Sequence, residues 1–198
     1  MHFATVLSIV VLSAVAVLGS PKNIAPKEFV IESPRITTYG VWGTTERCPF
    51  GTYAYAFRLK TENDQGAFRD DSALNVIELW CTSLNSTRTP EEFAINQPVR
   101  ITSLQGAVGN WGAIFECPIG HFITGFELRS EEDQKQFDDT AANNLRVQCS
   151  NNDWLQGDGT SWGFWSGQQL CPRDMYVCAL LTQVERYDPD SKHFQIQV

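Results

Sequence analysis

Two stretches of the chain carry one pattern, Trp42-Gly43-Thr44-Thr45-Glu46-Arg47-Cys48-Pro49 and Trp111-Gly112-Ala113-Ile114-Phe115-Glu116-Cys117-Pro118. A third copy runs from Trp162-Gly163 to Cys171-Pro172, with a longer spacing between its two ends. A glutamate follows each cysteine at the same distance, at Glu62, Glu131 and Glu185. This recurrence indicates an internal repeat, in which neighbouring units bury their apolar faces against one another.

The residues after each Cys-Pro alternate between large apolar and other side chains, which is the pattern of a β-strand. Alternate residues of a strand share one face, so we expect the large side chains to enter a common core. They are Tyr53, Phe57 and Leu59, then Phe122, Phe126 and Leu128, then Tyr176, Leu180 and Thr182. The small residues Ala56, Gly125 and Ala179 lie between them. Their size predicts that a neighbouring element approaches closely at that point.

An Asp-rich turn and a second strand complete each unit. Asp70-Asp71-Ser72-Ala73-Leu74-Asn75 aligns without a gap with Asp138-Asp139-Thr140-Ala141-Ala142-Asn143, and the strands that follow end at Cys81 and Cys149. In the third copy, Asp188-Pro189-Asp190-Ser191 replaces the turn and Phe194 replaces the asparagine. Phe194, Ile196 and Val198 still alternate as in a strand, so this repeat is degenerate rather than absent.

These units predict an all-β protein of three meanders or Greek keys, with repeats at about 33–96, 97–150 and 151–198. Three amphipathic sheets can hide their apolar faces only against each other, so we expect them to surround a common core. A hydrophobic content of 42% excludes a disordered chain. A net charge of −8 without a basic stripe excludes nucleic acid and anionic membranes as partners.

The amino end predicts export. Residues 3–19 are apolar and uncharged, but too short and too interrupted by Ser and Thr for a comfortable membrane span. We interpret residues 1–19 as a cleaved signal peptide and 20–198 as a single secreted, extracellular domain with no membrane insertion. Asn85-Ser86-Thr87 is a glycosylation acceptor sequence in a polar stretch, where a glycan on Asn85 would be exposed.

Secretion makes disulfides the expected state of the six cysteines, which lack the spacing of a metal site. Cys48 to Cys81 and Cys117 to Cys149 span almost the same number of residues. Equivalent positions in the repeat therefore predict these two bridges and leave Cys171 with Cys178.

The patterns Trp-Gly, Cys-Pro, Phe-x-Leu-x-x-Glu and Asp-Asp-Thr-Ala-x-Asn occur together with Gly157-Asp158-Gly159-Thr160 in the third copy. Over roughly Thr37 to Glu185 the chain thereby resembles the vitelline membrane outer layer protein 1 family. The resemblance implies a type I-like β-prism of three Greek-key sheets with pseudo-threefold symmetry, secreted into egg coats, mucous layers or other extracellular fluids. It also implies association with carbohydrate, including N-acetylglucosamine polymers, and brings no catalytic residue set. The departures from the family pattern lie in the third copy.

Paired carboxylates are the candidates for catalysis. Glycoside chemistry needs two carboxyl groups roughly 5 to 9 Å apart across a sugar. Glu62, Glu131, Asp71 and Asp139 are the residues that the repeat could supply for it. We favour a turn-building role for the aspartates and a structural role for the glutamates, so no catalytic residue is assigned. We also expect no nucleophile motif, no metal site and no cofactor.

Trp154, Trp165 and Glu185 are the candidates for ligand contact. Tryptophans beside acidic and amide groups can stack on sugar rings. Trp154 and Trp165 have no counterpart in the other copies, which favours a role outside the repeated core. Core or corner packing is expected for the repeated tryptophans Trp42, Trp111 and Trp162.

Two functions from different classes remain. The preferred one is a non-enzymatic, secreted structural or glycan-associating component of an extracellular coat, mucus or fluid, with glycans or other coat proteins as partners. The alternative is a carbohydrate-active transferase or hydrolase acting on N-acetylglucosamine oligosaccharides with two of the four carboxylates.

Overall fold

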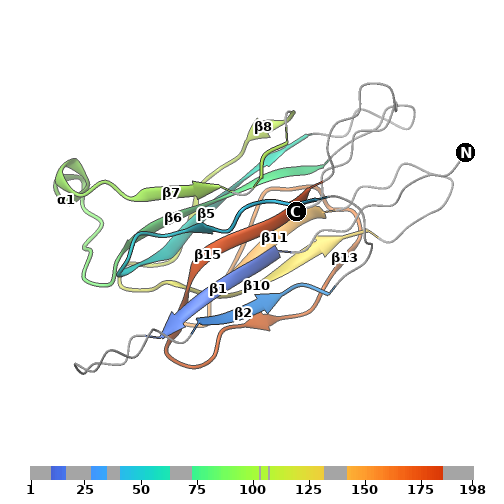
Figure 1. The fold of residues 1–198 in the computed structure, drawn as a ribbon. Helices are drawn as coiled ribbons and strands as arrows, with labels where there is room; N and C mark the ends of the chain where they lie inside the picture. Colours follow the sequence, from blue (N-terminus) through green and yellow to red (C-terminus); the bar gives the residue numbers. More distant parts are fainter. Residues whose placement is uncertain are drawn as a thin grey trace, which may run out of the picture.

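The computed structural model describes residues 10–16, 28–34, 41–62, 73–102, 104–106, 108–131 and 142–184. These residues form three five-stranded sheets, and a short helix stands out at one end of them (Figure 1). The long strands of the three sheets contact one another, so the molecule is a three-sided β-prism. The expected all-β class and the type I-like prism of three sheets are confirmed.

Each sheet is built on one long central strand, and every pairing is antiparallel. The first sheet consists of β5 (Thr52–Thr61), β6 (Leu74–Ser83), β7 (Val99–Thr102), β8 (Asn110–Trp111) and β9 (Phe115–Glu116). The second consists of β10 (Ile123–Ser130), β11 (Ala142–Cys149), β12 (Trp154–Gln156), β13 (Phe164–Trp165) and β14 (Gln169–Leu170). The third consists of β15 (Met175–Val184), β1 (Val10–Ala16), β2 (Glu28–Glu32), β3 (Val41–Trp42) and β4 (Glu46–Arg47). The helix is α1 (Pro90–Ile95), and no described helix is long and apolar enough to cross a membrane.

The central strand of each sheet pairs with two short strands from the next repeat along the chain. β8 and β9, which follow β7 in the second repeat, pair with β5 of the first. β13 and β14 pair with β10 in the same way. β3 and β4 of the first repeat pair with β15 of the third and so close the ring. Because every sheet joins two repeats, none of the three units can form its sheet alone.

The three central strands have the same register, including one β-bulge. The pairing skips Tyr55 in β5, Thr124 in β10 and Cys178 in β15, which are equivalent positions of the repeat. A bulge places two residues of one strand opposite one of its partner and increases the local twist. A shared irregularity of this kind confirms the pseudo-threefold relation between the sheets.

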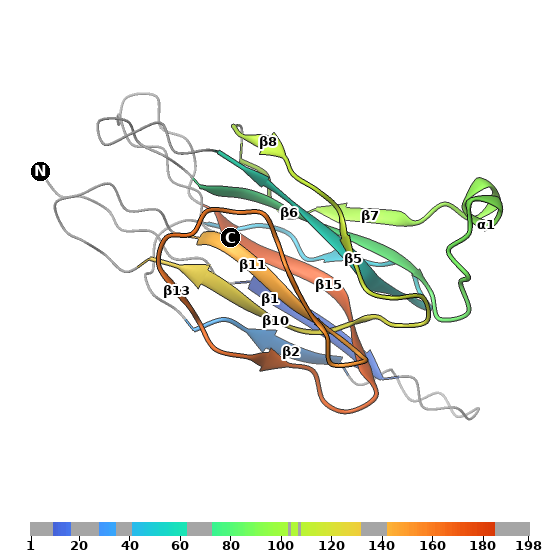
Figure 2. The ribbon, with the colours of Figure 1, turned by 180° about the vertical axis from the view of Figure 1, so that it is seen from behind.

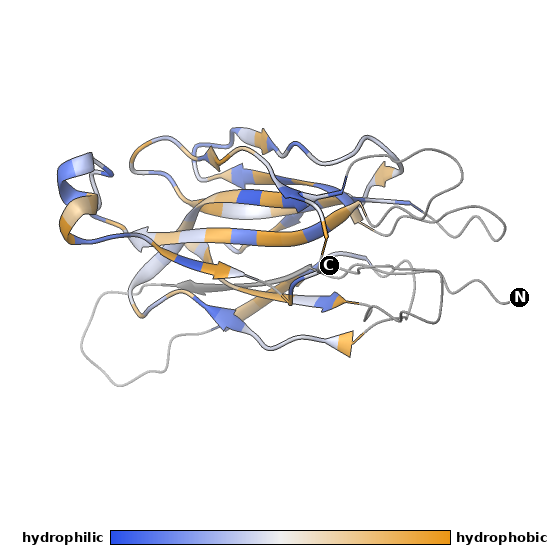
Figure 3. Cartoon of the chain, turned by 90° about the horizontal axis from the view of Figure 1, so that it is seen from above, coloured by the Kyte–Doolittle hydropathy of each residue, from blue (hydrophilic) through white to orange (hydrophobic). Residues whose placement is uncertain are grey.

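The core lies between the three sheets, where the predicted apolar faces meet. Phe57, Phe126 and Leu180 occupy equivalent positions and are fully buried. Figure 3 shows the underlying alternation of apolar and polar residues along the strands. Four residues before these positions, toward the Cys-Pro turns, three aromatic rings meet, one from each repeat. The ring centroids of Tyr53, Phe122 and Tyr176 lie 5.5–6.3 Å apart, a spacing at which aromatic pairs attract each other.

The predicted close approach at the small residues is present at Gly125. A Cβ atom on Gly125 would lie 2.5 Å from Leu170 Cδ2 and 2.7 Å from Gln169 O in the neighbouring strand β14. Ala56 and Ala179 face β9 and β4 at the equivalent points of their sheets and are buried. A larger side chain at these positions would push the short strand off the central strand.

Two of the three predicted disulfides are present. Cys48 bonds Cys81, and Cys117 bonds Cys149. The predicted bridge between Cys171 and Cys178 is wrong for this structure, in which both residues are thiols. Cys171 occupies the same position of the repeat as Cys48 and Cys117. The position of their partners, Cys81 and Cys149, is taken in the third sheet by Ala14.

The repeat therefore offers Cys171 no equivalent cysteine, and Cys178 lies at the bulge of β15. Burial, together with the neighbouring Cys178 thiol, raises the pKa of Cys171 to about 12. The Cys171 thiol consequently stays protonated at neutral pH, which makes it a poor nucleophile.

Two phenylalanines provide a test of the shared core. Phe57 is fully buried, whereas Phe50, on the nearby Cys-Pro turn, is 99% exposed. We expect Phe57→Ala to lower the free energy of unfolding by about 3–5 kcal/mol because it opens a cavity between three sheets. Phe50→Ala should change it by about 0.5 kcal/mol or less. Urea unfolding followed by tryptophan fluorescence measures both, and similar losses for the two variants would contradict the placement of the core.

Candidate functional site

The outer face of the second sheet carries an ion pair between its two long strands. Glu127 and Arg146 lie opposite each other in the pairing of β10 with β11. The Arg146 guanidinium donates to Glu127 Oε2 from Nη2 at 2.6 Å and from Nε at 3.1 Å. The Glu127 side chain is only 3% exposed and that of Arg146 is 31% exposed. A carboxylate buried to this extent depends on its partner, because an unpaired buried charge is costly.

Two tryptophans flank Arg146 on this face. Its guanidinium carbon lies 5.2 Å from the ring centroid of Trp154 on β12 and 4.6 Å from that of Trp165 on β13. The Arg129 guanidinium lies 5.7 Å from the Trp165 ring, and both rings are half-buried. These are distances at which a cation is attracted to an aromatic ring. We call the group the arginine–tryptophan face; it consists of Glu127, Arg129, Arg146, Trp154 and Trp165, on strands that Figure 2 shows from behind.

The strand pattern explains why these residues share one face. Phe126 and Leu128 of β10 are buried in the core. Glu127 lies between them and Arg129 follows Leu128, so both of these side chains point outward. Trp165 lies opposite Arg129. Trp154 lies opposite Gln148, which is two residues from Arg146 along β11. Four strands thus contribute to one surface, and the short strands β12 and β13 bring in the two rings.

The first sheet repeats this arrangement with the charges exchanged. Arg58 on β5 donates to Glu78 Oε1 on β6 at 2.7 Å and lies 4.2 Å from the centroid of the Trp111 ring. Trp80 Nε1 donates to the same carboxylate oxygen at 2.9 Å. The third sheet has Leu181 at the position of Arg58 and Glu127, so this ion pair is absent from its described residues.

The structure corrects the expectations about the tryptophans. Trp165, and not Trp162, is the counterpart of Trp42 and Trp111, because all three lie opposite the equivalent residue of a central strand. Ser166 donates its backbone N–H to Leu128 O at 2.8 Å, as Gly43 and Gly112 do in their sheets. The dipeptide Trp162-Gly163 therefore does not mark the repeat position, although it matches Trp42-Gly43 and Trp111-Gly112 in sequence.

Of the expected core or corner packing, the core alternative is wrong for Trp42 and Trp111, which are 37% and 38% exposed. The carbonyls of Trp162 and Gly163 instead accept hydrogen bonds from Arg129 Nε, each at 3.1 Å. Trp162 thereby helps to position Arg129 beside Trp165.

The carboxylates proposed for catalysis are only partly described. Glu62 directly follows β5 and Glu131 directly follows β10, and both are half-buried. Asp71, Asp139 and Glu185 lie outside the described residues. Among the residues described, no group of three His, Cys, Asp or Glu side chains could hold a metal ion.

The Gly157-Asp158-Gly159-Thr160 segment has a structural role that its sequence did not reveal. Asp158 Oδ2 accepts a hydrogen bond from Ala113 N at 2.7 Å and so ties the third repeat to the second. Asn144 Nδ2 donates to Gly157 O at 3.0 Å, and Thr160 Oγ1 donates to Asn143 Oδ1. These hydrogen bonds hold the turn against β11 and against the second repeat.

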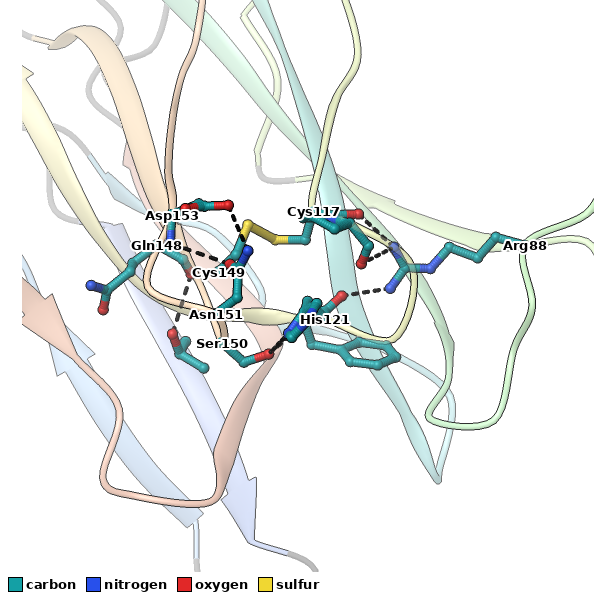
Figure 4. Close-up of a disulfide and its surroundings, with 11 residues drawn as sticks. Arg88, Cys117, His121, Gln148, Cys149, Ser150, Asn151 and Asp153 are labelled. Carbon is teal, nitrogen blue, oxygen red and sulfur yellow. Dashed lines mark hydrogen bonds between the residues drawn. A yellow bond between two sulfur atoms is a disulfide. The ribbon is translucent and has the colours of Figure 1, made fainter.

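Sequence reasoning also missed Arg88, which joins the end of the first repeat to the second repeat (Figure 4). Its guanidinium donates to Cys117 O at 2.7 Å and to His121 O at 2.5 Å, and it lies 4.2 Å from the Tyr55 ring centroid. Desolvation by burial lowers the pKa of Arg88, and burial raises the pKa of Tyr55 to about 12. His121 is half-buried, and its Nδ1 lies 3.0 Å from Ser150 Oγ. Asn85, shortly before Arg88, is exposed in a turn.

Comparison with known proteins identifies the family. Residues 29–194 match the family model described as vitelline membrane outer layer protein I (VOMI). The chain is 36% identical over 157 residues to the vitelline membrane outer layer protein 1 homolog of Homo sapiens, an alignment covering 79% of this chain and 73% of that protein. The chain belongs to the vitelline membrane outer layer protein I family. The Mus musculus homolog is also 36% identical, over 150 residues that cover 75% of this chain and 70% of the relative.

Two solved structures align with this VOMI-family chain at low sequence identity. The agglutinin of Calystegia sepium aligns with a TM-score of 0.42 and 13% identity, over 77% of this chain and 93% of its own. A point variant of Malaysian banana lectin aligns with a TM-score of 0.32 and 9% identity, over 75% of this chain and 100% of its own.

The exchanged charges of the two sheets provide a test of the arginine–tryptophan face of this VOMI-family protein. Glu127→Arg should lower the free energy of unfolding by about 3–5 kcal/mol, because it leaves two cations facing each other at a buried position. The double variant Glu127→Arg with Arg146→Glu should recover most of this loss, because it reproduces the Arg58–Glu78 orientation of the first sheet. Urea unfolding of the two single variants and the double variant completes the cycle. A double variant as unstable as the sum of its singles would show that the pair is not interchangeable.

Proposed function

We propose that this protein is a non-enzymatic, secreted component of an extracellular coat, mucus or fluid, and that it associates with glycans through the arginine–tryptophan face. The observation that carries the proposal is Trp154 and Trp165 held half-exposed on either side of Arg146. Sugar rings present an apolar face of C–H groups that packs on an aromatic ring, while their hydroxyl groups seek hydrogen bonds.

The face is preorganised for such contacts. The guanidinium between the rings is fixed by Glu127, so little side-chain entropy would be lost on binding. Arg129 Nε donates hydrogen bonds to the Trp162 and Gly163 carbonyls, and these bonds hold the guanidinium in place beside Trp165. Aromatic surface and fixed N–H donors in one patch suit a ligand with both apolar and hydroxyl-bearing sides.

The same geometry favours binding over catalysis on this surface. Glu127 and Glu78 are 3% and 7% exposed and are already paired with arginines. A glycosidase needs two carboxyl groups that reach the bond from opposite sides of the sugar. The enzyme alternative therefore rests on Glu62, Glu131, Asp71 and Asp139 alone.

Export is supported by several features together. Residues 1–19 have the composition of a signal peptide, and the fold contains two disulfides, which persist in oxidising compartments. Asn85 lies exposed in a turn, where a glycan could be attached without disturbing the core.

Tryptophan variants and a glycan array test the proposed face. Trp165→Ala and Trp154→Ala should each weaken retention on the glycans that the protein binds by about tenfold, the effect of losing one stacking contact. Trp42→Ala is the matched control, because Trp42 is the repeat counterpart of Trp165 on the third sheet, where Leu181 replaces the ion pair. Equal losses for all three variants would place binding elsewhere.

The array should include N-acetylglucosamine oligosaccharides as well as acidic glycans. Retention no greater than background for every glycan would remove the binding proposal and leave a structural role. Turnover of chito-oligosaccharides that disappears in Glu62→Gln or Glu131→Gln would establish the enzyme alternative instead.

A further inference from the structure

The outer face of the first sheet carries a second group of arginines and tryptophans. Arg58 Nε and Trp80 Nε1 both donate to Glu78 Oε1, at 2.7 and 2.9 Å, and the Glu78 side chain is only 7% exposed. The Arg58 guanidinium carbon lies 4.2 Å from the centroid of the Trp111 ring. The guanidinium carbon of Arg100, an exposed residue on the edge strand β7, lies 5.9 Å from that of the Trp80 ring. We call these five residues, which come from four strands, the first-sheet face.

The first-sheet face has the composition of the arginine–tryptophan face but not its arrangement. Each face holds two arginines, two tryptophans and one buried glutamate. Only the tryptophans of β8 and β13 occupy equivalent positions of the repeat. In the first sheet the second tryptophan lies on β6, opposite Arg100, whereas in the second sheet it lies on β12, opposite Gln148. The two sheets therefore reach one composition from different positions, which inheritance from a common repeat does not explain.

The fold itself does not require this group of residues. The third sheet has the same register and the same bulge, with Leu181 at the position of Arg58. The arginine on its described strands, Arg47 of β4, pairs with Glu28 at 2.6 Å, and both side chains are exposed. Because a sheet of this kind forms without the group, its presence on the other two sheets points to a site added to the fold.

The charges indicate which ligand such a site would take. On each face two guanidinium groups share one buried carboxylate, so one positive charge remains there on a chain of net charge −8. Lys60 and Glu116 add one charge of each sign to the first sheet. Arginine binds a carboxylate through two parallel N–H donors, and tryptophan packs on the apolar side of a sugar ring. The net negative charge of the chain repels densely charged polyanions, which favours sugars with isolated carboxylates.

We propose that the first-sheet face is a second binding site for glycans that carry isolated carboxylate groups, and that the protein is therefore bivalent; this inference rests on the proposed function. The two faces belong to different sheets of a three-sided prism and point in different directions (Figure 2). One molecule thus bridges two glycan chains. Retention on a dense glycan array then depends on both sites, because a second attachment raises the apparent affinity without any new contact.

Titration calorimetry with a hyaluronan hexasaccharide, in which uronic acid alternates with N-acetylglucosamine, counts the sites. We expect two hexasaccharides to bind each protein chain. Reduction of the carboxylates to alcohols should weaken binding about tenfold, because it removes a charge-assisted hydrogen bond at each site. Sialyllactose, with one terminal carboxylate, is the second probe. Two sites for either acidic probe support the proposal, and the tighter probe shows whether the acid is internal or terminal.

Paired variants assign the two sites to their sheets. Arg100→Gln with Trp111→Ala should remove one site, and replacing both tryptophans of the arginine–tryptophan face by alanine should remove the other. The matched control, Arg47→Gln with Trp42→Ala, takes the same residue types from the third sheet and should keep both sites. Urea unfolding shows whether each variant is folded. Arg100→Gln alone changes an exposed side chain and should weaken its site about tenfold, so it tests the first-sheet face even if the double variant unfolds.

Beads coated with hyaluronan test bridging. The unmodified protein should agglutinate them, whereas each single-face variant should bind the beads without agglutinating them. A single site that disappears with the tryptophans of the arginine–tryptophan face would overturn the second site and leave the proposed function intact. Equal binding of acidic and carboxyl-reduced sugars would overturn the ligand class, and agglutination by either single-face variant would overturn bivalency. Failure to bind any glycan would overturn the proposed function as well.

Discussion

The structure depends on three central strands that must present the same apolar face to one axis. Tyr53, Phe122 and Tyr176 meet there, one ring from each repeat. A single sheet of this kind has no other way to keep its apolar face from water, because helical cover is missing from the described part of the chain apart from the six-residue α1, which buries none of its residues. The common register and common bulge follow from this constraint, since a shift by one residue would turn each core face outward.

The outer faces of the sheets are not subject to that constraint, and the repeats differ from one another there. The first sheet pairs Arg58 with Glu78, and the second pairs Glu127 with Arg146 in the opposite orientation. What is retained is charge complementarity next to a tryptophan, not the identity of either residue. The third sheet has Leu181 instead. Function in a repeat protein of this kind is therefore to be sought on the outside of individual sheets, where one copy can acquire a ligand site without disturbing the shared core.

The third sheet closes the ring of three sheets, and it is assembled from strands that are far apart along the chain. Its short strands β3 and β4 come from the first repeat, and its second long strand β1 comes from residues 10–16, near the amino end of the given sequence, rather than from the third repeat. A protein built from interlocked sheets cannot tolerate an open edge, because unpaired backbone groups either find a partner within the chain or recruit one from another molecule.

The sequence by itself determined the two long strands of the first and second repeats, the central strand of the third, their inward faces and two disulfides, because a period of two and a recurring Cys-Pro pattern depend only on neighbours along the chain. Tertiary structure decided which tryptophan belongs to the repeat: Trp165 is the counterpart, with Ser166 making the backbone bond that glycine makes elsewhere. It also decided the grouping of Trp154, Arg146 and Glu127, and the burial of Arg88 against the second repeat. These contacts join residues on different strands or different repeats, so they are set by the register between strands. No pattern within one segment of the chain encodes that register.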